Sequence, residues 1–316
     1  YYLIEQKMVI GTGLFSQGFR TPSSIFYFNS NLYLPLIDYY LFNLFPVYIL
    51  GFGNLILIKE ILKKEINFFN FLSLLSLIFV NIFFYRLAEH GTDRSAMILI
   101  FIFVIEILKQ LNIRDTNKDR IFKIYILISL IISLKAFYFL YTIFLFPIFF
   151  QHVLIYKNIK KFFSNFIFNR SFLISFIITI FVIMSYFFNS SCLIYPVSFT
   201  CIENVNWSLT SDDIKSSNEW FELWSKAGAT PNYVTNVDER SEYISKFNWV
   251  NNWFYQYFFT KVSDFIFGIL LLGLIIFFSF YKIRDKNIHK KNQIKFLSIL
   301  LISLILIFEW FYNHPA

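Results

Sequence analysis

Long apolar runs separated by short polar clusters dominate the chain from about residue 32 to its end. An α-helix rises 1.5 Å per residue, and about 20 apolar residues cross a hydrocarbon core of roughly 30 Å. Most of these runs are near the lower end of that length. They predict six membrane-spanning helices, at about residues 32–57, 67–85, 95–111, 169–188, 264–282 and 296–311.

A seventh apolar run, from Ile121 to Val153, is too long for one straight span and is interrupted by Lys135. We interpret it as two helices that turn near this lysine, of which the first has only about 13 residues. A broken or re-entrant hairpin fits this pattern. The predicted fold class is therefore all-α, a polytopic transmembrane protein with about eight membrane segments.

Composition supports this interpretation, because 57% of the residues are hydrophobic, 22% are aromatic and only 15% are charged. These values lie outside the range of soluble globular domains. A net charge of +8 would suggest nucleic-acid binding in a soluble protein. Here, however, the Lys and Arg residues form short clusters between apolar runs, as membrane orientation requires. We therefore expect membrane lipid, and no nucleic acid, as a partner.

Eighteen of the 28 Lys and Arg residues fall on the loops of one side, which the positive-inside rule makes cytoplasmic. Residues 1–31, 86–94 and 189–262 are then outside. All six tryptophans fall on that side or at its membrane border, where amphipathic rings are favoured. The predicted regions are an outer loop 1–31, a transmembrane region 32–188, a periplasmic region 189–262 with interfacial helices, and a C-terminal transmembrane region 263–316.

The chain begins at Tyr1 and stops just after an apolar run, so we expect a fragment truncated at both ends. In the long outer region, Thr210 followed by Asp213 predicts a capped helix to about Lys226. A second helix is predicted over about residues 239–257. Cys192 and Cys201, the only cysteines, are both on the oxidising side, so a disulfide is as plausible as two free thiols.

The loop from Arg86 to Arg94 carries five ionisable side chains. Glu89 and Asp93 are candidate catalytic bases, or ligands of a divalent cation such as Mg²⁺. Arg86, His90 and Arg94 are candidate ligands of a phosphate. The alternative is that a short loop between spans must be polar and that its charges merely pair at the surface. No metal-binding sequence motif is present.

Lys135 is the second candidate, since an ionisable group between Leu134 and Ala136 is costly unless it reaches water, a carboxylate or a phosphate. At the tip of a broken hairpin it could meet a lipid phosphate. The alternative is that its ammonium extends to a lipid headgroup. Arg20, in the first outer loop, is a further candidate for phosphate binding. Glu106 could pair with a base near a membrane border.

The order of these features resembles the GT-C class of membrane glycosyltransferases, and more closely a poorly characterised family of bacterial multi-spanning proteins distantly related to it. Asp93 and Lys135 carry part of the resemblance. The other segments that carry it are Val9-Ile10-Gly11-Thr12-Gly13-Leu14, Phe28-Asn29-Ser30, Leu193-Ile194-Tyr195-Pro196, Val205-Asn206-Trp207 and Trp310-Phe311-Tyr312-Asn313-His314-Pro315. The resemblance implies a GT-C-like fold in the bacterial inner membrane and a polyprenyl-phosphate-linked sugar as donor. It also implies an acidic residue in the first outer loop, where only Glu5 precedes the first predicted span.

We therefore expect a GT-C-like glycosyltransferase that acts at the outer face of the inner membrane. Two alternatives remain open. One is a transporter or flippase of polysaccharide or lipid-linked intermediates, although no internal repeat is evident. The other is a membrane assembly subunit with no chemistry of its own.

Overall fold

The structure of the chain is a computed structural model. It describes residues 2–5, 9–63, 67–84, 87, 91–112, 118–156, 169–227, 239–262 and 290–313, with isolated positions at 266, 270 and 273. Over these residues the chain is helical and contains no β-strand, which confirms the predicted all-α class. The chain divides into two compact units, and each is described by itself. Unit 1 holds residues 1–195, 199–209 and 290–299, and unit 2 holds residues 196–198, 210–289 and 300–316.

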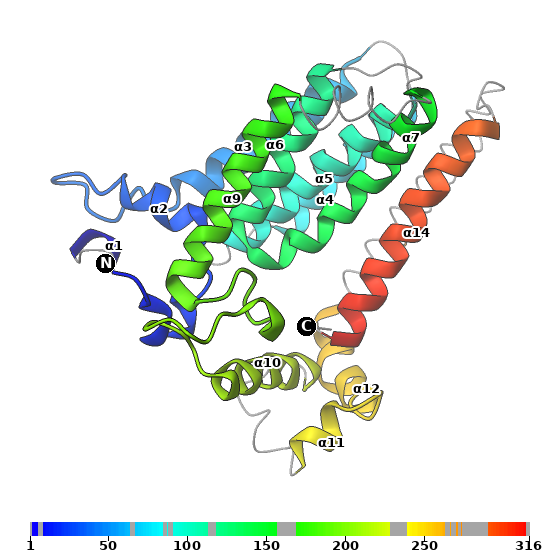
Figure 1. Cartoon of the computed structure of the whole chain (residues 1–316). Coiled ribbons are helices and arrows are strands. Elements are labelled where there is room, and N and C mark those ends of the chain that lie inside the picture. Colours follow the sequence, from blue (N-terminus) through cyan, green and yellow to red (C-terminus); the bar gives the residue numbers. More distant parts are fainter. Residues whose placement is uncertain are drawn as a thin grey trace. The chain divides into compact units, whose positions relative to one another are not determined.

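The helices of unit 1 form a bundle of antiparallel neighbours (Figure 1). They are α3 (Leu44–Ile61), α4 (Phe68–Phe83), α5 (Gly91–Asn112), α6 (Lys118–Leu134), the 3₁₀ helix η3 (Ala136–Leu145), α7 (Phe146–Tyr156) and α9 (Arg170–Ser190). Helix α5 is the centre of the bundle, because it packs on α3, α4, α6, η3 and α7. Helix α3 can approach it closely at Gly53, where an added Cβ would meet Ile98 Cγ2 at 2.8 Å.

Three described helices are long and apolar enough to cross a membrane: Leu44–Ile61, Thr92–Asn112 and Arg170–Ser190. Inside the protein, 67% of the α5 span is buried, compared with 22% for α3 and 11% for α9. Shorter apolar helices cover Phe68–Phe83, Ala136–Gln151 and Leu297–Asn313. The last belongs to α14 (Lys290–Asn313). The predicted run 264–282 lies outside the described residues except for its three isolated positions.

The first predicted span begins later than the hydrophobic pattern indicates. Residues 32–43 form turns, and α3 starts only at Leu44. Leu36 and Asp38 adopt positive φ angles of 72° and 51°. Both belong to a tight turn that is closed by an isolated backbone bridge between Leu34 and Asp38. Such backbone cannot continue a right-handed helix. The prediction of a helix from residue 32 is therefore wrong for its first twelve residues, although these residues are apolar enough.

The turn predicted at Lys135 is confirmed. Helix α6 ends at Leu134, Lys135 is extended with φ −157° and ψ 129°, and η3 begins at Ala136. Helix α6 has 17 residues rather than the predicted 13, because it already starts at Lys118. We call the end of the bundle that carries Asp93, Lys135 and Ser190 the outer end, and the end that carries Ile61, Asn112 and Arg170 the inner end, after their predicted orientation.

Short helices and a disulfide complete the outer end of unit 1. They are α1 (Tyr2–Glu5), the 3₁₀ helices η1 (Thr12–Leu14) and η2 (Gln17–Phe19), and α2 (Ser24–Ser30). Helix η1 packs on α9, where Gly11 N donates to Phe188 O at 2.8 Å and Thr12 Oγ1 donates to Asn189 Oδ1. Gly11 has φ 84°, which a residue without Cβ adopts readily. Cys192 and Cys201 form the disulfide that was one of two open alternatives.

Unit 2 holds the predicted capped helix. Helix α10 runs Ser211–Lys226, and the Thr210 side chain accepts a hydrogen bond from Asp213 N at 3.1 Å. The second predicted helix, 239–257, is wrong as one continuous element. It divides into α11 (Arg240–Ile244), α12 (Val250–Trp253) and the π-helix η7 (Phe254–Val262), and Lys246 between them has φ 51°. The short 3₁₀ helix η5 (Ser198–Thr200) has Ser198 in unit 2 and its other two residues in unit 1.

Candidate functional site

Two charged residues that are far apart in the sequence meet at the outer end of unit 1. The Lys135 Nζ atom lies 2.6 Å from Asp93 Oδ1. Asp93 is in the first turn of α5, where the positive end of the helix dipole favours a carboxylate. Lys135 reaches it because the chain leaves α6 in extended conformation directly before η3. Helix α5 and the extended residue between α6 and η3 therefore bring together the carboxylate and the amine that the sequence singled out separately.

The pair remains accessible, since 47% of the Lys135 side chain and 36% of the Asp93 side chain are exposed. The Asp93 carboxylate also interacts electrostatically with Tyr138, which is only 4% exposed and lies in the first turn of η3. A half-exposed ion pair contributes about 0–1 kcal/mol to stability because water screens it. The pair is thus more important as a local arrangement of charges than as a support of the fold.

Arg94 is a further cation in the first turn of α5. Its Nη1 atom is buried and has no hydrogen-bond partner among the residues that the structure describes. A buried guanidinium nitrogen without an acceptor costs free energy, so this atom is a candidate contact for an anion. Arg94 follows Asp93 in the first turn of α5. Asp93, Arg94 and Lys135 together carry two positive charges and one negative charge.

The other members of the predicted loop fall in two groups. Arg86, Glu89 and His90 lie outside the described residues, so their predicted roles stay predictions. Leu87 is described and is 5% exposed, in an apolar cluster with Val80, Phe84 and Ile98. The loop therefore combines a charged part with an apolar anchor that packs into the bundle.

Arg20 has a clear structural role. Its Nε donates to Gly13 O at 3.1 Å, its Nη1 donates to Tyr195 Oη at 2.5 Å, and its guanidinium carbon lies 5.1 Å from the centre of the Tyr195 ring. These contacts join η2 to the loop that the disulfide closes. The described contacts of Arg20 thus support the fold of the outer end, and its predicted role in phosphate binding stays a prediction.

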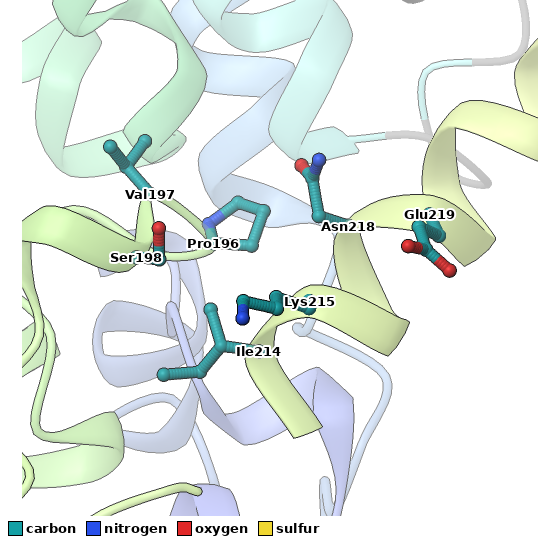
Figure 2. Close-up of a pocket in the computed structure, with 7 residues that line it drawn as sticks. All are labelled: Pro196, Val197, Ser198, Ile214, Lys215, Asn218 and Glu219. Atoms are coloured by element: carbon teal, nitrogen blue, oxygen red, sulfur yellow. The ribbon is translucent and has the colours of Figure 1, made fainter. Parts of the chain in front are cut away.

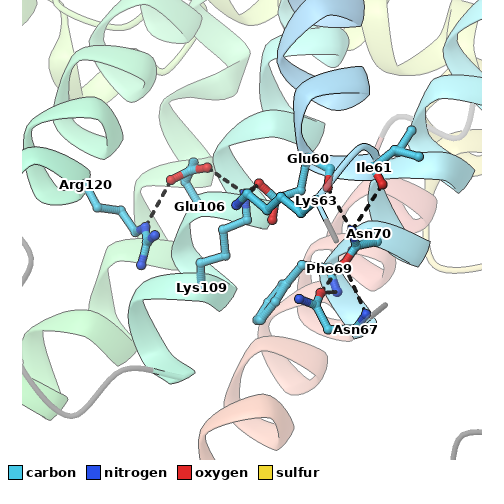
Figure 3. Close-up of polar contacts among 9 residues, drawn as sticks. All are labelled: Glu60, Ile61, Lys63, Asn67, Phe69, Asn70, Glu106, Lys109 and Arg120. Carbon is cyan, nitrogen blue, oxygen red and sulfur yellow. Dashed lines mark hydrogen bonds and ion pairs between the residues drawn. The ribbon is translucent and has the colours of Figure 1, made fainter. Parts of the chain in front are cut away.

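The inner end of unit 1 holds a longer series of ion pairs, which Figure 3 shows. Lys109 Nζ lies between Glu60 Oε2 at 2.8 Å and Glu106 Oε1 at 2.9 Å. Arg120 Nε lies 3.2 Å from the second oxygen of Glu106, and Lys63 Nζ lies 2.6 Å from Glu60. The expectation that Glu106 pairs with a base is confirmed. Sequence reasoning missed Glu60, whose partner Lys109 is 49 positions away along the chain.

This network is buried, because the side chains of Lys109 and Glu60 are only 9% and 10% exposed. The turn beside it is fixed by Asn70, whose Nδ2 donates to Glu60 O at 2.8 Å, and by the Asn67 cap of α4 (Figure 3). Opposite charges alternate along the series, and each carboxylate faces two cations. The arrangement joins α3, α5 and α6 and is typical of a structural ion-pair network.

Unit 2 buries one lysine that the sequence did not single out. Lys226 is 1% exposed, pairs with Glu222, and donates to Ile244 O at 2.8 Å. Its ammonium lies 5.5 Å from the centre of the Trp249 ring and 5.3 Å from that of Tyr312. The spacing of Glu222 and Lys226 by four residues on a helix is the one sequence signal of this contact.

Tyr243 completes the core around this lysine. Its hydroxyl donates to Lys226 O at 3.0 Å and accepts from Asn252 Nδ2 at 2.7 Å. Burial raises the pKa of the Tyr243 phenol, and the hydrogen bond from Asn252 acts in the opposite direction. These contacts hold α10, α11 and α12 together as one small core.

A surface cavity of about 340 Å³ lies in unit 2 between residues 196–198 and α10. Figure 2 shows its lining residues. The polar ones on α10 are Lys215, Asn218 and Glu219, and the apolar ones include Pro196 and Ile214. The cavity contains none of the predicted site residues. Within the described ranges, no three His, Cys, Asp or Glu side chains converge on a point that could hold a metal ion.

The fold and the site define an all-helical protein with helices long and apolar enough to cross a membrane and a half-exposed Asp–Lys pair at one end of its bundle. The chain belongs to the family described as a domain of unknown function (DUF8201), whose model matches residues 2–315. No curated protein sequence and no solved structure matches the chain.

Proposed function

We propose that the chain is a multi-pass membrane protein with about eight membrane segments that binds a lipid-linked sugar phosphate at its outer end. The observation that carries this proposal is the accessible contact between Lys135 Nζ and Asp93 Oδ1 at the start of α5, the helix turn in which Arg94 Nη1 has no hydrogen-bond partner within the described residues. Sugar transfer from a phosphate donor requires cations that hold the phosphate. It also requires, next to them, a carboxylate that can accept a proton. The inner membrane of a bacterium is the proposed location.

The proposed activity is glycosyl transfer of the GT-C type from a polyprenyl-phosphate-linked sugar. Asp93 takes the proton of an acceptor hydroxyl while that oxygen forms a bond to the anomeric carbon of the sugar. The bond from the anomeric carbon to the phosphate oxygen breaks, and the lipid phosphate leaves with the electron pair. Lys135 and Arg94 neutralise the charge on this phosphate, and Glu89 assists Asp93.

A divalent cation such as Mg²⁺ would be held by Asp93 and Glu89 if the reaction uses one. In this proposal it would neutralise charge on the leaving phosphate. Asp93 is present at the outer end, while Glu89 lies outside the described residues. Because carboxylate oxygens are the ligands that Mg²⁺ prefers, this pair is the appropriate donor set to test.

A second candidate function is a subunit that binds the lipid phosphate without transforming it. The observation that favours it is the same ion pair, because the Asp93 carboxylate already contacts an ammonium instead of being free to meet an acceptor hydroxyl. Transport of a lipid-linked intermediate is a third candidate, favoured by the broken backbone at Lys135. The three candidates differ in whether a covalent product forms and whether the lipid crosses the membrane.

The experiment uses purified full-length protein in proteoliposomes with a radiolabelled polyprenyl-phosphate hexose. We expect Asp93→Asn to lower the transfer rate at least about 100-fold, the lower limit for a general base. We expect Lys135→Ala to weaken donor binding by about 10–100-fold, the loss of one charge-assisted hydrogen bond. Lys123→Ala, an exposed lysine on α6, is the matched control and should match the wild type.

Three other outcomes would count against the enzyme. Transfer at the wild-type rate by Asp93→Asn would show that Asp93 is not the base. Movement of intact donor between the leaflets, with no product, would identify a transporter. Saturable binding with neither product nor movement would identify the binding subunit.

A further inference from the structure

Two asparagines join α3 to α4 on the surface of the unit 1 bundle. Asn54 Nδ2 donates to Asn81 Oδ1 at 3.0 Å, and Asn81 Nδ2 donates to Asn54 Oδ1 at 3.1 Å. Asn81 Nδ2 also donates to Leu77 O at 2.8 Å. Both hydrogens of the Asn81 amide are therefore used, whereas the second N–H of Asn54 has no acceptor among the residues that the structure describes.

Asn54 lies too deep in its candidate span for water or lipid headgroups to complete its hydrogen bonds. It follows Leu44, the first residue of α3, by ten positions and precedes Ile61, the last, by seven. With the rise of an α-helix, these separations are about 15 and 10 Å. An amide with an unused donor is costly in hydrocarbon, and a hydrogen bond to another helix removes this cost. Only 22% of the α3 span is buried inside the protein, so a second helix has access to it.

The exposed face of α3 beside Asn54 allows a helix to approach closely. Tyr48, Gly51, Leu55 and Ile58 are exposed and recur at intervals of three and four, so they lie on one face of the helix. A Cβ added at Gly51 would meet no atom of the described chain within 4 Å. A residue without a side chain on such a face lets the backbones of two membrane helices come together.

We propose that this face of α3 is the interface at which two copies of the chain associate in the membrane. Asn54 donates to Asn54 of the partner subunit and accepts from it in return. All copies of a membrane protein have the same orientation, so a two-fold axis between them is perpendicular to the membrane and brings identical residues together at equal depth.

The chemistry of the amide favours a second copy over other occupants. An amide that keeps one N–H and one carbonyl lone pair is complementary to itself. The acyl chain of a lipid offers neither a donor nor an acceptor. A different helix would need a polar side chain at the same depth, whereas a second copy supplies one by symmetry. The inference is independent of the proposed sugar transfer, since a dimer forms whether or not the protein is an enzyme.

The test measures association of the full-length protein in liposomes of phosphatidylethanolamine and phosphatidylglycerol, by energy transfer between donor-labelled and acceptor-labelled copies. We expect a dimer whose dissociation constant rises about tenfold in Asn54→Leu, or ~1.4 kcal/mol, through the loss of two hydrogen bonds between helices. Gly51→Leu should weaken association at least as much, although the added side chain has space in the single chain. Gly273→Leu makes the same change at another glycine with an open Cβ position, and this matched control should associate like the wild type.

Cross-linking locates the interface. A short bifunctional maleimide should join two copies of Leu55→Cys, but not two copies of Phe181→Cys, an exposed position on α9. Gly51→Leu keeps the test valid if Asn54→Leu does not fold, because Leu favours a helix more than Gly does. Absence of energy transfer, unchanged association in both α3 variants, or equal cross-linking from α9 would overturn the proposal. Cross-linking of Leu55→Cys to a different membrane protein, with no dimer, would overturn the second copy as the occupant.

Discussion

The two ends of the unit 1 bundle both carry ion pairs, but they differ in burial. At the inner end, Glu60, Lys109 and Glu106 are nearly buried, and every carboxylate faces two cations. At the outer end, Lys135 and Asp93 are about half and one-third exposed. A buried network supports a fold, whereas an exposed pair is open to a ligand.

The largest effect is expected when the inner network is broken. Lys109→Met leaves Glu60 and Glu106 without the ammonium between them, and loss of one partner of a buried pair costs about 3–5 kcal/mol. Thermal unfolding in detergent would measure the loss. Lys59→Met is the matched control, because this lysine on α3 is exposed. Equal stability of the two variants would show that the inner network does not support the fold.

A smaller effect is expected from opening the disulfide at the outer end. Replacing Cys192 and Cys201 by Ser releases a loop closed over nine positions. By loop-closure entropy this costs roughly 2–3 kcal/mol, less than the inner network. The loop also carries Tyr195, which holds Arg20, so limited proteolysis should cut this region faster in the double variant. Unchanged proteolysis would show that the other contacts of Arg20 are sufficient.

The outer pair itself should contribute little to stability. A double-mutant cycle with Asp93→Asn and Lys135→Met should give a coupling free energy of about 0.2–1 kcal/mol, as in other partly exposed pairs. The same variants are expected to impair donor handling strongly. A coupling energy of several kcal/mol would place the outer pair in the same structural class as the inner network and weaken its assignment as a site.

The smallest change is expected from salt, and it separates the two ends without mutation. Raising the ionic strength from 0.1 to 1 M shortens the Debye length from about 10 Å to about 3 Å. Binding of the lipid phosphate at the exposed outer end should weaken with salt, while thermal unfolding governed by the buried inner pairs should change little. Binding that does not respond to salt would indicate that the hydrocarbon chain alone determines affinity.

Much of the fold could be predicted from the hydrophobic pattern. The helices near residues 67–85, 95–111 and 169–188 and the turn at Lys135 follow from apolar length and one interrupting charge. The start of α3 could not be predicted in this way, since the backbone of Leu36 and Asp38 depends on local turns rather than on hydrophobicity. The division of residues 239–257 at Lys246 was missed for the same reason, because the aromatic positions keep a helical spacing across it.

The sequence by itself determined which charges are unusual, since Lys135 interrupts an apolar run and Asp93 lies directly before another, where ionisable groups are costly. Only the tertiary structure decided that these two meet, because a contact across 42 positions depends on how α5 and α6 pack. It also decided that Lys109 and Lys226 are buried. The amino-acid composition limits which residues can form ion pairs. Which of them do so depends on how the helices pack, because the distances between side chains are set only in the folded chain.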